Sequence, residues 1–207
     1  MTWEFNKDVA KSFKLHATQH IPNYHQVIDQ CIAICKKKDK SIKIIDIGCA
    51  IGETLVRLHA EGFSNIYGVD NSQSMLDQCP PNIATLICSN TLPQNFYDVI
   101  LMNWTLHFIK DKKRYLQDIY NNLTPNGILV ISEKTSLDPL AIKFYHDYKR
   151  TRGVSELDIQ KKETSVKDIM YIDTIEWYQG IFKELGFSKV HIINAHWCFT
   201  TFICVKT

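Results

Sequence analysis

Short apolar runs rich in Ile and Val alternate along this chain with longer stretches whose apolar residues recur at helical spacing. The alternation is typical of βαβ units, in which each parallel strand is followed by a helix that packs back onto the sheet. We therefore predict an α/β fold with a doubly wound, mostly parallel sheet of seven strands. The predicted strands are Ile42–Ile47, Asn65–Val69, Ala84–Cys88, Tyr97–Asn103, Gly127–Glu133, Lys189–Asn194 and Phe199–Val205.

The last two predicted strands are separated only by His196 to Cys198, which is too short for a crossover between parallel strands. We expect them to form an antiparallel hairpin at the end of the chain. Because the usual dinucleotide-binding sheet is all parallel, this hairpin favours a Rossmann-like fold that binds S-adenosylmethionine.

Residues with known capping chemistry mark the ends of several predicted helices. Glycine readily adopts the left-handed conformation that closes a helix, as expected for Gly62 after Glu53–Glu61 and for Gly186 after Thr174–Leu185. Asp side chains accept hydrogen bonds from the free N–H groups of a first turn. Helix starts are therefore predicted at Asp138, before Pro139, and at Asp173, three residues before Glu176.

The length of 207 residues, with 45% hydrophobic content, allows roughly 70% of the unfolded surface to be buried in one core. We expect a single domain, residues 1–207. Helices within Asp8–His20 and Asn23–Lys38 precede the first strand, so residues 1–40 are predicted to cap one end of the sheet. Residues 136–187 are predicted to form a helical insertion that acts as a substrate lid.

The charge balance and the cysteines exclude several classes of protein. Lys and Arg number 24 against 22 Asp and Glu, a net charge of +2 that argues against non-specific binding of nucleic acid. No apolar stretch is long enough for a signal peptide or a membrane span, so we expect a cytoplasmic protein without a membrane partner. The seven cysteines include no C-x-x-C pair, which predicts reduced thiols and no metal site.

The stretch from Ile44 to Gly52 runs from a buried strand through a tight turn into a helix. Gly48 permits the turn, Ala50 is small enough to admit a ligand, and Gly52 lets the helix approach the strand. The spacing G-x-A-x-G differs from the G-x-G-x-x-G of nicotinamide enzymes and from a phosphate-binding loop. In an alternative interpretation, the two glycines only shape a strand-to-helix corner.

Two carboxylates accompany this turn. Asp70 ends the second strand roughly 20 positions beyond the glycines, where a carboxylate can accept both hydroxyl protons of a ribose. Asp46 lies at the end of the first strand and suits the positively charged amino group of a methionine moiety, directly or through water. Both would repel a phosphate, so together they predict S-adenosylmethionine as the cofactor. Alternatively, each Asp only caps the helix that follows it.

Further polar residues follow the third and fourth strands. Ser89 and Asn90 can contact the adenine edge, and Asn103 lies beside the expected sulfonium. The residues from Asn103 to Leu106 are not the Asn/Asp-Pro-Pro-aromatic element that holds an exocyclic base amine, which argues against DNA as substrate. His107 is the candidate general base because imidazole titrates near neutrality; the alternative is a structural histidine.

Two further groups of basic residues, one in the predicted lid and one near the amino terminus, are considered as binding sites. Lys149, Arg150 and Arg152 lie in the predicted lid, where they either bind an anionic acceptor or form a solvated helix face. His16 and His20 lie one helical turn apart but lack a third metal ligand with fitting spacing, so we assign them no function.

With these residues placed, the chain resembles class I S-adenosylmethionine-dependent methyltransferases, and specifically the carboxy-S-adenosylmethionine synthases that feed tRNA wobble-uridine modification. The resemblance covers nearly the whole chain. The matching motifs are Trp3-Glu-Phe5, Ile21-Pro22-Asn-Tyr24, Asp46-Ile-Gly48-Cys49, Val69-Asp70-Asn71-Ser72, Asn103-Trp-Thr-Leu, Ser132-Glu133-Lys134, His146-Asp147-Tyr148-Lys149-Arg150 and Ser155-Glu156-Leu157.

The resemblance implies a homodimer and a set of contacts with the nucleoside ligand. The implied contacts are Tyr24, Gly48, Cys49, Ala50, Asp70, Asn71 and Asn103. Asn90 stands where the family more often has an acidic residue. In those synthases an arginine after the Ser-Glu-Leu element holds the extra carboxylate of the product, and gapless matching from Ser155 puts Glu163 there. At ~4 Å and an effective dielectric near ~20, a pair of unit charges interacts with roughly 4 kcal/mol. Replacing the arginine by a glutamate turns that attraction for a carboxylate into repulsion, which argues against carboxyl transfer.

We therefore expect a methyltransferase that acts on a small-molecule acceptor. The alternatives are a carboxy-S-adenosylmethionine synthase that also uses prephenate, and a protein that binds S-adenosylmethionine without catalysis. Methyl transfer from a sulfonium needs no nucleophile from the protein, because positioning supplies most of the catalysis. The sequence accordingly names no catalytic residue beyond the candidate His107.

Overall fold

The computed structural model of the protein describes residues 5–207, and its centre is a seven-stranded sheet. Trp3 and Glu4 of the first matching motif lie outside the described residues. The strands are β1 (Ile44–Ile47), β2 (Ile66–Asp70), β3 (Thr85–Cys88), β4 (Tyr97–Asn103), β5 (Leu123–Lys134), β6 (Phe187–His196) and β7 (Phe199–Lys206).

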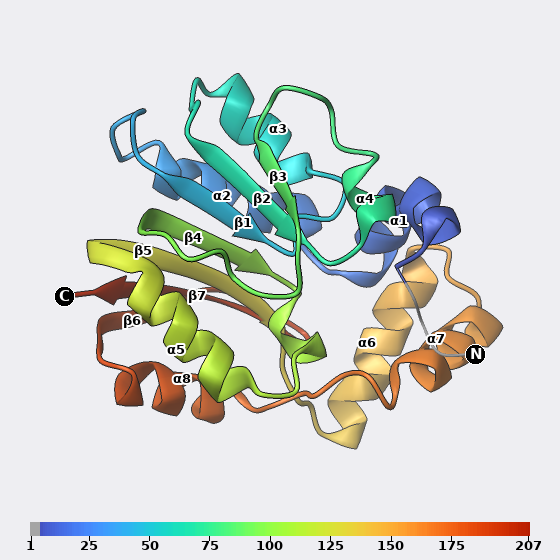
Figure 1. The fold of residues 1–207 in the computed structure, drawn as a ribbon. Helices are drawn as coiled ribbons and strands as arrows, with labels where there is room; N and C mark the ends of the chain where they lie inside the picture. Colours follow the sequence, from blue (N-terminus) through green and yellow to red (C-terminus); the bar gives the residue numbers. More distant parts are fainter. Residues whose placement is uncertain (1–4) are drawn as a thin grey trace.

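The order across the sheet is β3-β2-β1-β4-β5-β7-β6 (Figure 1). Strand β7 is antiparallel to both of its neighbours, whereas β1 to β5 pair in parallel. This arrangement confirms the predicted doubly wound sheet and its antiparallel hairpin. Strand β4 has the predicted bounds, and β5 begins four residues earlier than expected.

Helices cover both faces of the sheet and one of its ends (Figure 1). They are α1 (Lys7–His20), α2 (Tyr24–Cys35), α3 (Glu53–Ala60), α4 (Gln73–Leu76), α5 (Lys112–Asn122), α6 (Pro139–Thr151), α7 (Glu156–Val166) and α8 (Ile175–Glu184), with a 3-10 turn η1 at Leu106–Phe108. Helices α1, α6 and α7 lie where the parallel strands end. No helix among residues 5–207 is long and apolar enough to cross a bilayer.

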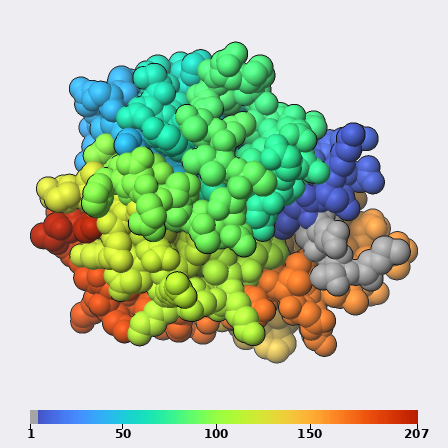
Figure 2. All heavy atoms as spheres, in the orientation of Figure 1, coloured from blue at the N-terminus to red at the C-terminus, as the bar shows by residue number. Residues whose placement is uncertain are grey.

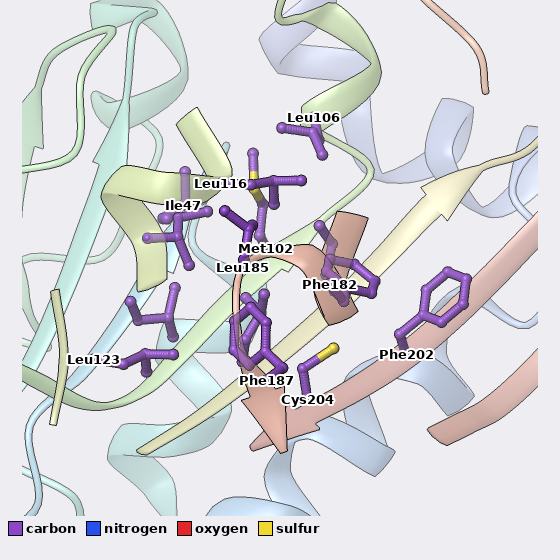
Figure 3. Close-up of a cluster of buried hydrophobic side chains, with 14 of the residues drawn as sticks. Ile47, Met102, Leu106, Leu116, Leu123, Phe182, Leu185, Phe187, Phe202 and Cys204 are labelled. Atoms are coloured by element: carbon purple, nitrogen blue, oxygen red, sulfur yellow. The ribbon is translucent and has the colours of Figure 1, made fainter. Parts of the chain in front are cut away.

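Each face of the sheet carries its own apolar core, because successive residues of a strand point to opposite faces. Ile100 and Met102 of β4 belong to the core beneath α5 and α8, which Figure 3 shows. Val99 and Leu101 belong to the core beneath α2 and α3. Helices on both faces explain why the middle of β4 is a continuous apolar run.

Only part of each predicted helical region covers the end of the sheet. Helix α2 packs Cys31, Ile32 and Cys35 into the core on one sheet face, so α1 is the helix that caps the strand ends. Helix α8 likewise packs on the other face through Tyr178 and Phe182. Of the helices in the region predicted as a lid, α6 and α7 line the cavity, whereas the apolar face of α8 is buried against the sheet.

The predicted helix ends are confirmed at three of the four positions. Gly62 and Gly186 have φ values of +87° and +95°, in the left-handed region. The Asp138 carboxylate accepts from the backbone N–H groups of Leu140 and Ala141.

The predicted start at Asp173 is wrong. Thr174 is the N-cap of α8, and its hydroxyl accepts from the Trp177 N–H at 3.1 Å. The Asp173 carboxylate instead pairs with the ammonium of Lys112, which is only 4% exposed. A buried ammonium needs a charged partner more than a helix terminus needs a second capping residue.

Candidate cofactor and acceptor site

A cavity of about 360 Å³ lies at the carboxyl ends of β1, β2 and β4. The strand order reverses between β1 and β4. In open α/β sheets ligands bind at this switch point, because the loops diverge there and leave a crevice. Helices α1, α6 and α7 also contribute residues to the cavity wall. In the surface view of Figure 2, α1 (blue) and the lid region (orange) are at the same end of the molecule.

The structure brings almost all of the predicted ligand contacts to this cavity. Its wall includes Tyr24, Asp46, Gly48, Cys49, Ala50, Asp70, Asn71, Asn90, Asn103 and the candidate base His107. Gly52 does not belong to the wall. It precedes α3 with a φ of +80°, and a Cβ atom there would lie 2.8 Å from Cys79 Sγ. Gly52 therefore lies at the strand-to-helix corner, behind the cavity wall.

Gly48 is required by packing as well as by the turn. Its φ is +70°, and a Cβ atom would lie 2.0 Å from the hydroxyl of Thr105, which follows β4. The Gly48 N–H donates to the Val69 carbonyl at 2.8 Å. The turn is thus held between β2 and the segment after β4, and the left-handed Ala50, with a φ of +47°, presents only a methyl group beside the cavity.

Asp70 faces the glycine turn. Its Oδ2 accepts from the Ala50 N–H at 2.9 Å, and its Oδ1 accepts from the Ser72 N–H at 2.9 Å. Burial raises the pKa of Asp70, while its backbone donors oppose that shift. Each carboxylate oxygen has a second lone pair. The hydroxyl groups of a ribose can therefore donate to Asp70 without breaking the bonds that orient it.

Asp46 and Glu53 supply two more carboxylates beside this turn. Asp46 is 3% exposed, and burial raises its pKa to about 7, with nearby Asp70 adding to the rise. Glu53, the first residue of α3, was not predicted as a site residue. Its Oε1 accepts from Arg57 at 2.7 Å, but the buried Oε2 makes no hydrogen bond within residues 5–207. Carboxylates with unused acceptor capacity fit a ligand that carries an amino group and a sulfonium.

The cavity wall also contains Trp104, which was not predicted as a site residue, stacked on the predicted contact Tyr24. The rings of Tyr24 and Trp104 stack with centroids 4.9 Å apart and planes 24° apart. Trp104 has a φ of +57°, and its N–H donates to the Ser132 carbonyl at 2.6 Å. A left-handed conformation is costly for a large residue. Here it accompanies the placement of Trp104 in the cavity wall.

Three lysines from distant parts of the chain meet in the cavity wall. Lys134 ends β5, Lys149 lies on α6 and Lys162 lies on α7. The Lys149 ammonium is 4.5 Å from the ring centre of Tyr145, and that of Lys134 is 5.6 Å from it. Burial, together with the nearby charge of Lys134, lowers the pKa of Lys162 to about 6. An anion in this part of the cavity would restore the charge that burial disfavours.

Glu163 lies in the cavity wall, where its carboxylate is already paired. It bonds to His146 Nε2 and lies 3.6 Å from the Lys149 ammonium. The basic residues predicted for this region divide into two groups, because Lys149 lines the cavity whereas Arg150 and Arg152 do not. Arg150 instead pairs with carboxylates on the lid surface.

His16 and His20, to which the sequence assigned no function, lie in the cavity wall. Their rings stack with centroids 4.1 Å apart. Burial lowers the pKa of His16 to about 4 and that of His20 to about 3, so both are neutral near pH 7. Within residues 5–207, no group of three or more His, Cys, Asp or Glu side chains is arranged to hold a metal ion.

The fold and this site define a class I S-adenosylmethionine-dependent methyltransferase. Residues 23–192 match the family model for the methyltransferase domain, so the chain belongs to that family. Among its relatives is the carboxy-S-adenosyl-L-methionine synthase of Actinobacillus pleuropneumoniae, 29% identical over 98% of this chain and 92% of the relative. The synthase of Shewanella loihica is 30% identical over 99% of this chain and 93% of the relative.

Solved structures show the same fold at lower identity. The magnesium protoporphyrin IX methyltransferase of Synechocystis, solved with bound S-adenosylhomocysteine, is 13% identical and has a TM-score of 0.66 over 91% of this chain and 86% of that one. A methyltransferase of Mesorhizobium loti is 15% identical, with a TM-score of 0.65 over 93% of this chain and 100% of that one. The comparisons confirm the predicted fold class, enzyme class and cofactor.

Proposed function

We propose that the protein transfers the methyl group of S-adenosylmethionine to a small molecule that carries a carboxylate or phosphate group. The observation that carries this proposal is the electrostatic division of one cavity. The side beneath the glycine turn presents Asp46 and Asp70, and the side beneath the lid presents Lys134, Lys149 and Lys162. A cationic cofactor suits the first side, and an anionic acceptor suits the second.

The cavity residues would hold the two ligands in a fixed relation. Asp70 would accept from the ribose hydroxyls, and Asp46 with Glu53 would hold the amino group. When bound, S-adenosylmethionine supplies an activated methyl group on a good leaving group. The lysines orient the acceptor through its anion, and α1, α6 and α7 exclude water. Such positioning can contribute roughly 7–11 kcal/mol toward the barrier of a two-substrate reaction.

A carboxy-S-adenosylmethionine synthase is the second candidate. It is favoured by relatives of that name that are 29–30% identical over nearly the whole chain. By the resemblance, Glu163 stands where the synthases have the carboxylate-binding arginine, but its carboxylate bonds to His146 Nε2 and lies 3.6 Å from the Lys149 ammonium. The lysines thus offer an alternative to that arginine, and the two reactions must be separated by their products.

The test is to incubate the protein with S-adenosylmethionine alone, with prephenate, and with a panel of carboxylate- and phosphate-bearing metabolites, and to weigh the nucleoside products by mass spectrometry. We expect S-adenosylhomocysteine to accumulate only with an anionic acceptor. A carboxylated nucleoside that forms only with prephenate would establish the second candidate. Binding without any product would contradict both and leave a non-catalytic cofactor-binding protein.

Variants of the cavity lysines test whether turnover depends on this site. The double variant K149A/K162A should lower turnover at least tenfold and leave the affinity for S-adenosylhomocysteine unchanged in calorimetry. Lys161 is exposed and does not line the cavity, so K161A is the matched control. Equal effects of K161A and K149A/K162A on turnover would contradict the role of the cavity lysines. Light scattering of the same samples checks the homodimer that the resemblance implies.

A further inference from the structure

His107 and Glu133 form a buried pair beside the cavity. His107 is 2% exposed and Glu133 is fully buried, and His107 Nδ1 lies 2.6 Å from Glu133 Oε2. The Glu133 carboxylate also accepts from three backbone N–H groups of the segment after β4, those of Thr105, Leu106 and His107, at 2.7–3.1 Å. A carboxylate with four donors is held in one orientation, and it holds the imidazole in turn.

The contacts of the pair decide which nitrogen of His107 carries the proton. An ionised carboxylate accepts hydrogen bonds only, so Nδ1 is the protonated nitrogen and Nε2 keeps its lone pair in the neutral ring. The fully buried polar side-chain atoms without a partner in residues 5–207 are Gln30 Oε1, Glu53 Oε2 and Tyr178 OH. Nε2 is not among them and makes no hydrogen bond in the described residues, while the ring lines the cavity. The basic nitrogen is therefore open to the cavity.

The pair adjoins the side of the cavity assigned to the acceptor. Lys134 follows Glu133 directly on β5 and belongs to the cavity wall, whereas Glu133 points away from it toward η1. Glu133, which orients the base His107, and Lys134, one of the anion-binding lysines, are thus consecutive residues of the same strand. Asn103, at the end of the neighbouring β4, lines the cavity as well.

We propose that His107 Nε2 is the general base that deprotonates a hydroxyl group of the acceptor and that Glu133 is its positioning residue, an inference that rests on the proposed methyltransferase function. As Nε2 accepts the hydroxyl proton, the electron pair of the oxygen forms a bond to the methyl carbon. The carbon–sulfur bond breaks and leaves its pair on sulfur. The imidazolium of His107 then gives its proton to water.

A base at this place selects the chemistry of the acceptor. A hydroxyl group remains protonated at neutral pH and is a weak nucleophile until its proton is removed. A thiol ionises much nearer neutrality and a neutral amine already has a free pair, so neither needs His107 to the same degree. The acceptor class is therefore a hydroxylated carboxylate or phosphate.

The tautomer is measured first, because it requires no acceptor. Protein labelled with ¹⁵N-histidine is studied by NMR with and without S-adenosylhomocysteine, and H107Q assigns the resonances. We expect the Nδ1–H tautomer with an unprotonated Nε2 in the wild type, and a mixture of tautomers in E133Q. H191Q changes an exposed histidine on β6 and is the control for labelling. A protonated Nε2 in the neutral ring of the wild type would overturn the assignment.

Methyl transfer is then compared for three matched anions, 4-hydroxybenzoate, 4-aminobenzoate and 4-mercaptobenzoate, with labelled S-adenosylmethionine. General base catalysis contributes about 10²–10⁴-fold, so H107Q should reduce transfer to the hydroxyl probe at least 100-fold more than transfer to the thiol probe. E133Q should shift the pH profile of hydroxyl transfer.

The outcomes distinguish an error in the assignment of His107 from an error in the proposed function. Equal losses with the hydroxyl and thiol probes would show a structural His107 and overturn the inference. A wild type that methylates only the amine or the thiol, or none of the three probes, would overturn the acceptor class. Absence of S-adenosylhomocysteine binding in calorimetry would instead contradict the proposed function, and the tautomer would still decide whether the pair exists.

Discussion

Replacing Asp70 by Asn tests how the cofactor is held, because it changes one acceptor oxygen into a donor and leaves the shape of the side chain unchanged. In the native protein the two oxygens of Asp70 accept from the N–H groups of Ala50 and Ser72, both at 2.9 Å. The amide of D70N can accept from only one of them. The other N–H then faces an NH₂ group, and one ribose hydroxyl loses its acceptor.

The effects of D70N on stability and on affinity differ in size. An unpaired buried N–H costs about 1–3 kcal/mol, but burial raises the pKa of Asp70, so removing the charge offsets part of that cost. We expect a net destabilisation of about 1 kcal/mol. Hydrogen bonds to a charged group are worth about 1.5–3 kcal/mol each, and weakening both ribose contacts should cost about 2–4 kcal/mol. At about 1.4 kcal/mol per tenfold, affinity should fall about 30- to 1000-fold.

Asp98 offers a matched control. Its carboxylate accepts from the Lys43 N–H at 2.8 Å and from the Thr124 hydroxyl at 3.1 Å, and it lies outside the cavity wall. D98N should lower the free energy of unfolding in urea and leave the affinity for S-adenosylhomocysteine in calorimetry unchanged. If D70N binds within threefold of the wild type, or if D98N loses as much affinity, Asp70 does not hold the ribose.

Three further changes test other parts of the site. Burial raises the pKa of Asp46 from 3.8 to about 7, so between these pH values the folded chain keeps a proton that the unfolded chain releases. The free energy of unfolding in urea should therefore fall between pH 4 and pH 7 by up to about 4 kcal/mol more in the wild type than in D46N. The same pH dependence of the unfolding free energy in both proteins would refute this. E163R should raise the yield of carboxylated nucleoside from prephenate above that of E163Q, measured by mass spectrometry, and equal yields would show that the charge at this position is immaterial. G48A should destabilise the protein by about 3 kcal/mol or more, because the Cβ of a left-handed Ala would overlap the Thr105 side chain. Thermal unfolding should show that G48A/T105A regains part of the lost stability, because the second change removes the overlapping hydroxyl.

The sequence by itself determined those features that depend on neighbouring residues. The continuous apolar run of β4 reflects burial on both faces, and the short connection between β6 and β7 permits only an antiparallel pair. The turn at Gly48 and the position of Asp70 at the end of β2 follow from the same local rules. These features could be predicted because backbone conformation and strand burial repeat with a short period along the chain.

Only the tertiary structure decided which distant side chains meet and what each one faces. Lys134, Lys149 and Lys162 come from three different elements and share a wall because α6 and α7 fold over the strand ends. Asp173 lost its predicted capping role to a pairing with Lys112, 61 residues away. The orientation of His107 likewise depends on Glu133 of the neighbouring strand. A local pattern carries no information about such partners, since strand order and helix packing set the direction of each side chain.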